Sequence, residues 1–223
     1  MNYQAVIFDL DGVICHTDNY HYQAWKQMAD REGIYFDESI NSRLRGVSRM
    51  ASLEIILERA QRTYTAAEKE ALAAEKNEIY RQLLMNMSPA DLSQDVAATL
   101  RQLKDAGVKI AIGSSSRNAK TILRQIGIFD WFDAISDGEN ITRSKPDPEV
   151  FVKAAGILGL APSACLVVED ADAGIRAAHD GGFHSAGMGD ACGNDEATYS
   201  IIAFHELSDI VLGKRMQNGP VTE

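Results

Sequence analysis

Four groups of polar residues in this 223-residue sequence could do chemistry together, because each follows an apolar run directly or after a loop. Residues two apart on a strand point to the same side, so two aspartates separated by one residue can both lie at a strand's end. In chain order the groups are Asp9 and Asp11 after AVIF (5–8), GSSSRN (113–118), Lys145 in RSKPDP, and Glu169-Asp170 after ACLVV (164–168).

The carboxylates of these groups need a positive partner. Two unit charges 4 Å apart repel by roughly 4 kcal/mol at an effective dielectric of 20. Carboxylate oxygens suit Mg²⁺, which takes one or two of them together with water and a phosphate oxygen. The serines and the helix start at 113–118 offer hydroxyls and N–H groups to an anion, and Lys145 offers a cation. The four groups therefore predict a magnesium and phosphate site.

Each group also has an ordinary structural interpretation. Asp11-Gly12 is a common turn sequence, Asp170 and the serines are good helix caps, and a lone lysine such as Lys145 is usually solvated. The order of the groups favours the site, because all four fall at successive expected strand ends and such motifs count only in that context.

Short, nearly continuous apolar runs are typical of strands buried on both faces of a parallel sheet. Helical patterns alternate with them, and several end at glycine. This alternation predicts an α/β fold with a doubly wound, Rossmann-like parallel sheet. The strands are expected at 5–8, 109–113, 133–136, 164–168 and 184–188, and the helices at 95–107, 118–127, 148–159 and 171–182.

The pattern changes between the first and second strands. Residues 16–90 contain no convincing strand, and helical stretches are expected around 18–31, 50–62 and 66–86. Apolar residues at helical spacing in the second stretch require a packing partner. We therefore expect an α-helical insert, a cap domain at 16–90, in an α/β core domain made of 1–15 and 91–223.

The amino-acid composition limits the classes of binding partner and the compartment that we expect. A net charge of −10 and a pI near 5.0 argue against nucleic acid or an anionic membrane. The three cysteines, Cys15, Cys165 and Cys192, form no CxxC pair, which suits a reducing compartment. The sequence has no apolar run of about 18 residues and no basic-then-apolar leader pattern, so we expect a cytoplasmic protein.

The set DLDGV, GSSS, SKPDP and VVED resembles the haloacid dehalogenase (HAD) superfamily, and the helical insert resembles its C1 type of cap. The resemblance implies that Asp9 attacks a phosphoryl group and forms an aspartyl phosphate, and that Asp11 is the general acid and base. It assigns Lys145 and Ser114 to the transferring phosphoryl group. The implied Mg²⁺ ligands are Asp9, the backbone carbonyl of Asp11, Asp170, and a water oriented by Glu169.

One subfamily, the β-phosphoglucomutases, matches further. DGVI, then Thr17, His21 and Trp25, RGVSR (45–49), Lys76-Asn77 and SPAD (88–91) follow its pattern in order. This resemblance implies that Thr17 and His21 hold the acid/base aspartate when the cap closes, and that Arg49, Ser116 and Asn118 bind the phosphate that is not being transferred. The full set of implied substrate-binding residues is Trp25, Arg45, Gly46, Val47, Ser48, Arg49, Lys76, Ser114, Ser115, Ser116, Arg117 and Asn118.

Three positions depart from the subfamily pattern. Cys15-His16 stands where the subfamily usually has a small or polar residue and an aspartate. Arg45 replaces a frequent lysine, which keeps the charge but changes the donor geometry. Ser115 replaces a common alanine.

The leading functional hypothesis is a monomeric mutase that interconverts β-glucose 1-phosphate and glucose 6-phosphate through glucose 1,6-bisphosphate. A Mg²⁺-dependent sugar-phosphate phosphatase is the enzyme alternative, since it needs the same core residues. A binding or regulatory protein on a retired scaffold is disfavoured because none of the expected catalytic carboxylates, nor Lys145, is missing.

Overall fold

The computed structural model describes residues 3–44 and 48–213. The chain divides into two compact units, one formed by 1–15 and 90–223 and the other by 16–89. The first is an α/β unit and the second is helical, and each is described by itself below.

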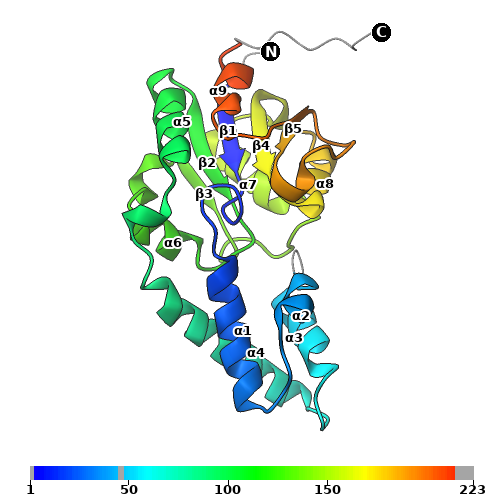
Figure 1. Cartoon of the computed structure of the whole chain (residues 1–223). Coiled ribbons are helices and arrows are strands. Elements are labelled where there is room, and N and C mark those ends of the chain that lie inside the picture. The colour runs from blue at the N-terminus through cyan, green and yellow to red at the C-terminus, as the bar shows by residue number, and fades with distance from the viewer. Residues whose placement is uncertain (1–2, 45–47, 214–223) are drawn as a thin grey trace, which may run out of the picture. The chain divides into compact units, whose positions relative to one another are not determined.

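Among the described residues, six parallel strands form the sheet at the centre of the α/β unit, in the order β3-β2-β1-β4-β5-β6. Figure 1 labels the first five of these strands. The five strands expected from the sequence are confirmed, each within a residue or so of the expected bounds. A short sixth strand was not expected from the sequence. The bounds are Ala5–Phe8 (β1), Lys109–Gly113 (β2), Ala134–Ser136 (β3), Cys165–Glu169 (β4), His184–Gly187 (β5) and Tyr199–Ser200 (β6).

The helices of this unit cover both faces of the sheet, as doubly wound folds require. α7 packs on β1, β2 and β3, α8 packs on β4 and β5, and α5 packs on β2 and on α9. Their bounds are Gln94–Asp105 (α5), Ala119–Gln125 (α6), Glu149–Leu158 (α7), Asp172–Asp180 (α8) and Glu206–Val211 (α9). In the part of the chain that the structure describes, 3₁₀ turns lie at Pro89–Asp91, Phe129–Trp131, Pro162–Ala164 and Gly189–Ala191.

Alternate residues of the strands enter two different cores. Ala5 and Ile7 of β1 belong to a buried cluster with Phe151 of α7 and Ala178 of α8. Phe8 lies one residue further along and stacks on Phe204, just before α9, with ring centroids 5.6 Å apart. Because β1 is fully buried on both faces, its carboxyl end is fixed by packing from both sides.

Strand order explains where side chains can meet. β1 pairs with β2 on one side and with β4 on the other, and the chain reverses its direction of winding between β1 and β4. Open α/β sheets bind ligands beyond the carboxyl ends of the strands at such a switch point.

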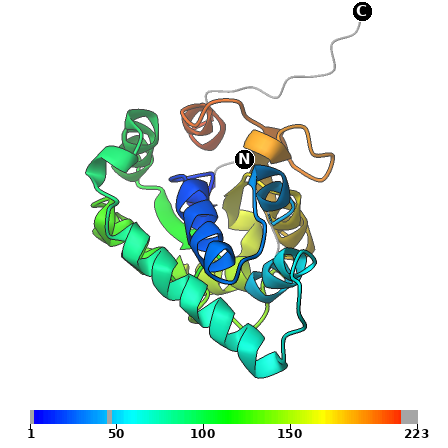
Figure 2. The ribbon, with the colours of Figure 1, turned by 60° about the horizontal axis from the view of Figure 1, so that its bottom comes forward.

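The described part of the helical unit contains four helices: Asp18–Arg31 (α1), Glu38–Ser42 (α2), Arg49–Leu57 (α3) and Ala66–Leu84 (α4). α1 packs along α4, and α3 packs on α4 as well, as the turned view makes visible (Figure 2). A capping box begins α4, since Thr65 accepts from the Glu68 amide and Glu68 accepts from the Thr65 amide. Met28, Leu53 and Ile56 are fully buried in the unit's own core. Within the described ranges, every helix is too short or too polar to cross a lipid bilayer.

Candidate active site

Three carboxylates gather at the switch point of the sheet. Asp9 follows β1 directly, Glu169 is the last residue of β4, and Asp170 comes next. One oxygen from each lies within 4.8 Å of the others. Asp9 and Glu169 are 8% and 1% exposed, so the cluster is largely shielded from water.

Lys145 supplies a cation to this cluster. Its Nζ donates to Asp9 Oδ1 and to Glu169 Oε1, and it lies 4.7 Å from the centre of the Phe151 ring on α7. The segment between β3 and α7 carries this lysine. The lysine thus places a positive charge next to two of the three carboxylates.

Burial and mutual repulsion perturb the titration of these groups. Burial, and then repulsion from Asp9, raises the pKa of Asp170 to about 7. Burial also raises the pKa of Glu169, against the opposing attraction of Lys145. Burial disfavours the charged form of Lys145, but Asp9 and Glu169 outweigh it and raise the pKa of the lysine. Strongly perturbed groups of this kind are typical of functional sites.

The donor set fits Mg²⁺. Three carboxylates and one lysine leave a formal charge of −2, which one divalent cation would cancel. Mg²⁺ binds oxygens at about 2.0–2.1 Å, so two of its ligands lie no more than about 4.2 Å apart. The observed 4.8 Å limit is therefore close to the required spacing. Asp9, Glu169 and Asp170 are the residues that could hold the ion, directly or through water.

Two glycines make room for the acidic side chains. A Cβ on Gly12 would lie 1.9 Å from Asp170 Oδ2, and the residue's φ of +80° favours glycine in any case. A Cβ on Gly174, in α8, would lie 2.0 Å from the Glu169 carboxyl carbon. The sequence analysis considered Gly12 only as part of an Asp-Gly turn and did not single out Gly174, although a glycine directly after an Asp-x-Asp pair signals such a close approach.

The serine segment after β2 forms a tight turn. The Ser116 amide donates to Ser114 Oγ at 3.2 Å, and the Asn118 amide donates to Ser116 Oγ at 3.2 Å. Ser114 is buried, and its own amide donates to the Ser136 carbonyl at the end of β3. Asn118 is buried at the start of α6, whereas Arg117 is exposed. Within the described ranges, the buried Ser115 Oγ has no hydrogen-bond partner.

A second polar group lies inside the helical unit. Lys76 is 3% exposed, and its Nζ lies 2.8 Å from His21 Nδ1 and 4.7 Å from the centre of the Trp25 ring. The sequence analysis missed Tyr80, one turn beyond Lys76 on α4. Its hydroxyl donates to Thr17 Oγ1 at 3.0 Å, and its ring stacks on His21 at 4.0 Å. Helical spacing from Lys76 was the available signal.

The imidazole in this group is held neutral. Burial, followed by the positive charges of Lys76 and Arg49, lowers the pKa of His21 well below its ordinary value. A neutral ring can accept the Lys76 N–H at Nδ1 and keep a proton on Nε2. The arrangement thus fixes one tautomer and offers a donor on the other side of the ring.

The predicted phosphate-binding loop is only partly described. Ser48 caps α3 by accepting from the Ala51 amide at 3.3 Å, and Arg49 donates to Asn77 Oδ1 on α4 at 2.8 Å. Arg45, Gly46 and Val47 lie outside the described residues.

Asp11 takes part in the charge balance of the acidic cluster. It forms a backbone bridge with Cys15, and its charge contributes to raising the pKa of Asp170. Cys15 is buried, and burial followed by the charge of Asp11 raises the pKa of its thiol. A thiol so far from ionisation is a poor nucleophile or metal ligand, which argues against a catalytic role for Cys15-His16.

An Asp-x-Asp pair after the first strand, a lysine before α7 and an acidic pair at the switch point define the class of HAD-like hydrolases. The sequence model of that class, described as haloacid dehalogenase-like hydrolase, matches residues 3–182. This chain therefore belongs to the haloacid dehalogenase-like hydrolase family, and it is an enzyme.

Comparison with individual relatives confirms the resemblance to the β-phosphoglucomutase subfamily. The chain is 46% identical over 188 residues to a β-phosphoglucomutase of Bacillus subtilis, covering 83% of both chains. It is also similar to a crystal structure of β-phosphoglucomutase from Clostridium difficile, with a TM-score of 0.84, 36% identity, and 95% and 96% of the two chains covered. A fructose-1-phosphate phosphatase of Escherichia coli is 32% identical, with 81% of this chain and 94% of the relative covered.

Proposed function

We propose that this enzyme is a phosphosugar mutase that interconverts β-glucose 1-phosphate and glucose 6-phosphate through a 1,6-bisphosphate. One observation carries the proposal over simple hydrolysis: each unit contributes a cation suited to a phosphate, Lys145 in the α/β unit and Arg49 in the helical unit. A bisphosphate intermediate needs two such cations, whereas a phosphatase that acts on a sugar monophosphate needs one. The 46% identity to a β-phosphoglucomutase supports this choice.

In the proposed mechanism Asp9 is the nucleophile. Its carboxylate attacks the phosphorus, the bond to the leaving sugar oxygen breaks, and an aspartyl phosphate forms. Lys145 donates to the phosphoryl oxygens, assisted by the buried Ser114. Asp11 gives a proton to the leaving oxygen and takes one from the incoming hydroxyl. Bound Mg²⁺ would neutralise negative charge that accumulates on the transferring group.

We further propose that residues 16–89 act as the sugar-binding cap. His21 and Lys76 carry hydrogen-bond donors suited to sugar hydroxyls. The Trp25 ring, whose centre lies 4.7 Å from Lys76 Nζ, adds an apolar surface suited to sugar C–H bonds. Arg49 would bind the phosphate that is not being transferred, with Ser116 and Asn118. Glucose 1,6-bisphosphate would charge the enzyme initially. We propose that the enzyme acts as a monomer, because a single chain carries all of these groups, and that it acts in the cytoplasm.

The second candidate is a sugar-phosphate phosphatase. It is favoured by the 32% identity to the fructose-1-phosphate phosphatase, since the same Asp9, Asp11 and Lys145 serve both reactions. The two enzymes differ in what attacks the aspartyl phosphate: a sugar hydroxyl in the mutase and water in the phosphatase.

Phosphorus NMR distinguishes the two candidates. The protein is incubated with Mg²⁺, β-glucose 1-phosphate and a trace of glucose 1,6-bisphosphate. A mutase gives glucose 6-phosphate with little inorganic phosphate, whereas inorganic phosphate as the main product establishes the phosphatase.

An arginine variant with a matched control tests the second phosphate site. Arg49→Ala should lose isomerisation severely. Arg43→Ala, which removes an exposed arginine paired with Glu58 in the same unit, should not. Equal activity of the two variants would contradict the role of Arg49.

A further inference from the structure

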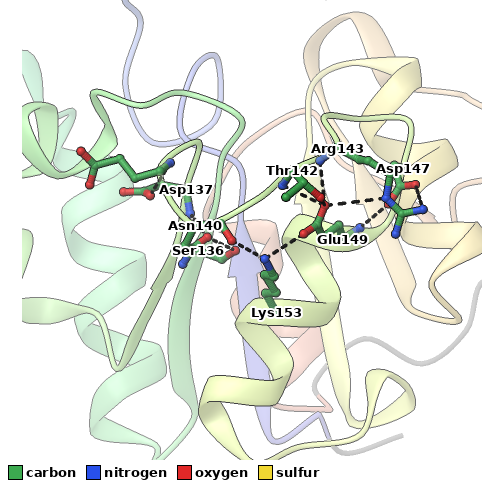
Figure 3. Close-up of polar contacts among 9 residues, drawn as sticks. Ser136, Asp137, Asn140, Thr142, Arg143, Asp147, Glu149 and Lys153 are labelled. Atoms are coloured by element: carbon green, nitrogen blue, oxygen red, sulfur yellow. Dashed lines mark hydrogen bonds and ion pairs between the residues drawn. The ribbon is translucent and has the colours of Figure 1, made fainter.

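The side chain of Glu149, the first residue of α7, fastens the loop that carries Lys145 to this helix (Figure 3). Its Oε2 accepts from the Thr142 amide at 3.0 Å, from the Thr142 hydroxyl at 2.9 Å and from the Arg143 amide at 2.7 Å. Its Oε1 lies 2.7 Å from Lys153 Nζ, one turn further along the helix. Glu149 thus binds the chain two and three residues before Lys145.

The chain is also held on the other side of Lys145. Asp147 Oδ1 accepts from the Glu149 amide at 3.0 Å, and the Asp147 amide donates to the Ser144 carbonyl at 3.1 Å. Lys145 therefore lies between two attachments to the first turn of α7. These attachments fix the backbone from which the lysine side chain extends, while the contacts of its ammonium group with Asp9 and Glu169 fix the other end.

Lys153 strengthens the same fastening. Besides its ion pair with Glu149, it donates to the Asn140 carbonyl at the start of the loop (Figure 3). Asn140 Oδ1 in turn accepts from the Asp137 amide at 3.1 Å and from the Ser136 hydroxyl at 3.2 Å. The network runs from the end of β3 to the first turns of α7, and the loop between them presents Lys145.

The side chains of Glu149 and Arg143 differ in their exposure to solvent. The Glu149 side chain is 12% exposed, and hydrogen bonds from Lys153, then from the Arg143 amide, lower its pKa to about 2. The Arg143 side chain, which spans Lys145 to reach Asp147 at 3.0 Å, is 70% exposed. Exposed ion pairs of this kind contribute little. The carboxylate–amide contacts of Glu149 are the ones expected to hold the loop.

We propose that Glu149 is a positioning residue for Lys145: by binding the 142–143 amides it places the ammonium group against Asp9 and Glu169, where the transferring phosphoryl group is bound. The inference rests on the proposed role of Lys145 in phosphoryl transfer. It predicts that loss of the Glu149 oxygen weakens transfer at Asp9 without weakening sugar binding.

Two substitutions separate positioning from simple charge. Glu149→Ala removes every contact, and displacement of a catalytic group by about 1 Å costs on the order of 100-fold in rate. We expect kcat to fall about 10- to 100-fold, with KM for the sugar phosphate nearly unchanged. Glu149→Gln keeps one oxygen acceptor for the loop amides and should recover most of that loss. A charge effect alone would leave the two variants equally impaired.

A second readout does not require turnover. Beryllium fluoride with Mg²⁺ mimics an acyl phosphate on an aspartate, and fluorine NMR reports its binding to Asp9. Glu149→Ala should bind the mimic at least about tenfold more weakly than the unchanged protein, with Glu149→Gln in between. Glu196→Gln is the matched control, because Glu196 is a surface carboxylate paired only with Arg176 among the described residues. It should change neither readout.

The outcomes distinguish this inference from the proposed function. If the protein makes inorganic phosphate instead of glucose 6-phosphate but Glu149→Ala still loses beryllium fluoride binding, the mutase assignment fails and the positioning role stands. If the protein is a mutase and Glu149→Ala matches the Glu196→Gln control in kcat and in mimic binding, the positioning role is wrong. Should Glu149→Ala not fold, Thr142→Val removes one of the three loop donors alone, and unchanged kcat and mimic binding in that variant would overturn the inference.

Discussion

Removing the Tyr80 hydroxyl should loosen the polar group of the helical unit by a predictable amount. Tyr80 and Thr17 are 1% and 0% exposed, and the hydroxyl of the first donates to Oγ1 of the second at 3.0 Å. Loss of a buried hydrogen bond costs about 1–1.5 kcal/mol, and more if the remaining oxygen finds no new donor. For a chain of this size that corresponds to a fall in Tm of about 2–6 °C.

A double-mutant cycle measures this hydrogen bond alone. Tyr80→Phe keeps the ring that stacks on His21, and Thr17→Val keeps the shape of the threonine. Thermal unfolding of both single variants and the double variant gives their coupling energy, which we expect to be about 1 kcal/mol. Contributions from other contacts of Thr17 cancel in the cycle.

The control for Tyr80→Phe is another tyrosine that donates to a side chain. Tyr35 is 67% exposed, and its hydroxyl donates to Asp37 at 2.8 Å, so Tyr35→Phe should leave Tm unchanged. Strictly additive effects of Tyr80→Phe and Thr17→Val, with a coupling below about 0.3 kcal/mol, would refute the reasoning.

Two further predictions concern the acidic cluster. We expect Mg²⁺ to raise the Tm of the unchanged protein. Gly174→Ala should force the Glu169 carboxylate to move, which lowers Tm and abolishes the response to Mg²⁺. Its control is Gly156→Ala, at a helical glycine with open space at its Cβ position, which should stabilise the protein by about 0.5–1 kcal/mol. An unchanged Mg²⁺ response in Gly174→Ala would contradict this. Without metal, the raised pKa of Asp170 makes the folded state bind its proton more tightly than the unfolded state, so this residue's contribution to stability falls as pH rises from about 4 to 7. In EDTA, the stability of Asp170→Asn relative to the unchanged protein should therefore increase as pH rises from about 4 to 7, and addition of Mg²⁺ should remove this advantage. Thermal unfolding at pH 4 and pH 7 checks this. A difference in Tm between the two proteins that does not change with pH would contradict it.

Local pattern was enough to predict the α/β framework. Val6 and Phe8 belong to a continuous apolar run because β1 is buried on both faces, and that periodicity is visible in the sequence. α1 begins and ends at the predicted residues, since Asp18 and Arg31 bound one amphipathic stretch. Strand β6 is two residues long and α2 is five, too short for any period to register.

Long-range contacts could not be predicted in the same way. Asp9 and Glu169 are 160 positions apart, and only the pairing of β1 with β4 brings their strand ends together. Tyr80 lies one turn from Lys76 on α4, but its partner Thr17 is 63 positions away, so helical spacing could indicate the residue and not its contact. Glu149 was not singled out, because its three loop donors are brought to it only when the chain between β3 and α7 is folded.

The central claim is that a phosphoryl group passes through the enzyme from one sugar to another, and a crossover experiment tests it most directly. β-Glucose 1-phosphate labelled with ¹³C in the sugar and ¹⁸O in the phosphate is mixed with an equal amount of unlabelled material, and the glucose 6-phosphate is analysed by mass spectrometry. Each product sugar should carry the phosphoryl group of an earlier molecule, so about half of the ¹³C-labelled product should contain unlabelled phosphate. Product in which the two labels remain together would contradict the aspartyl-phosphate mechanism at Asp9.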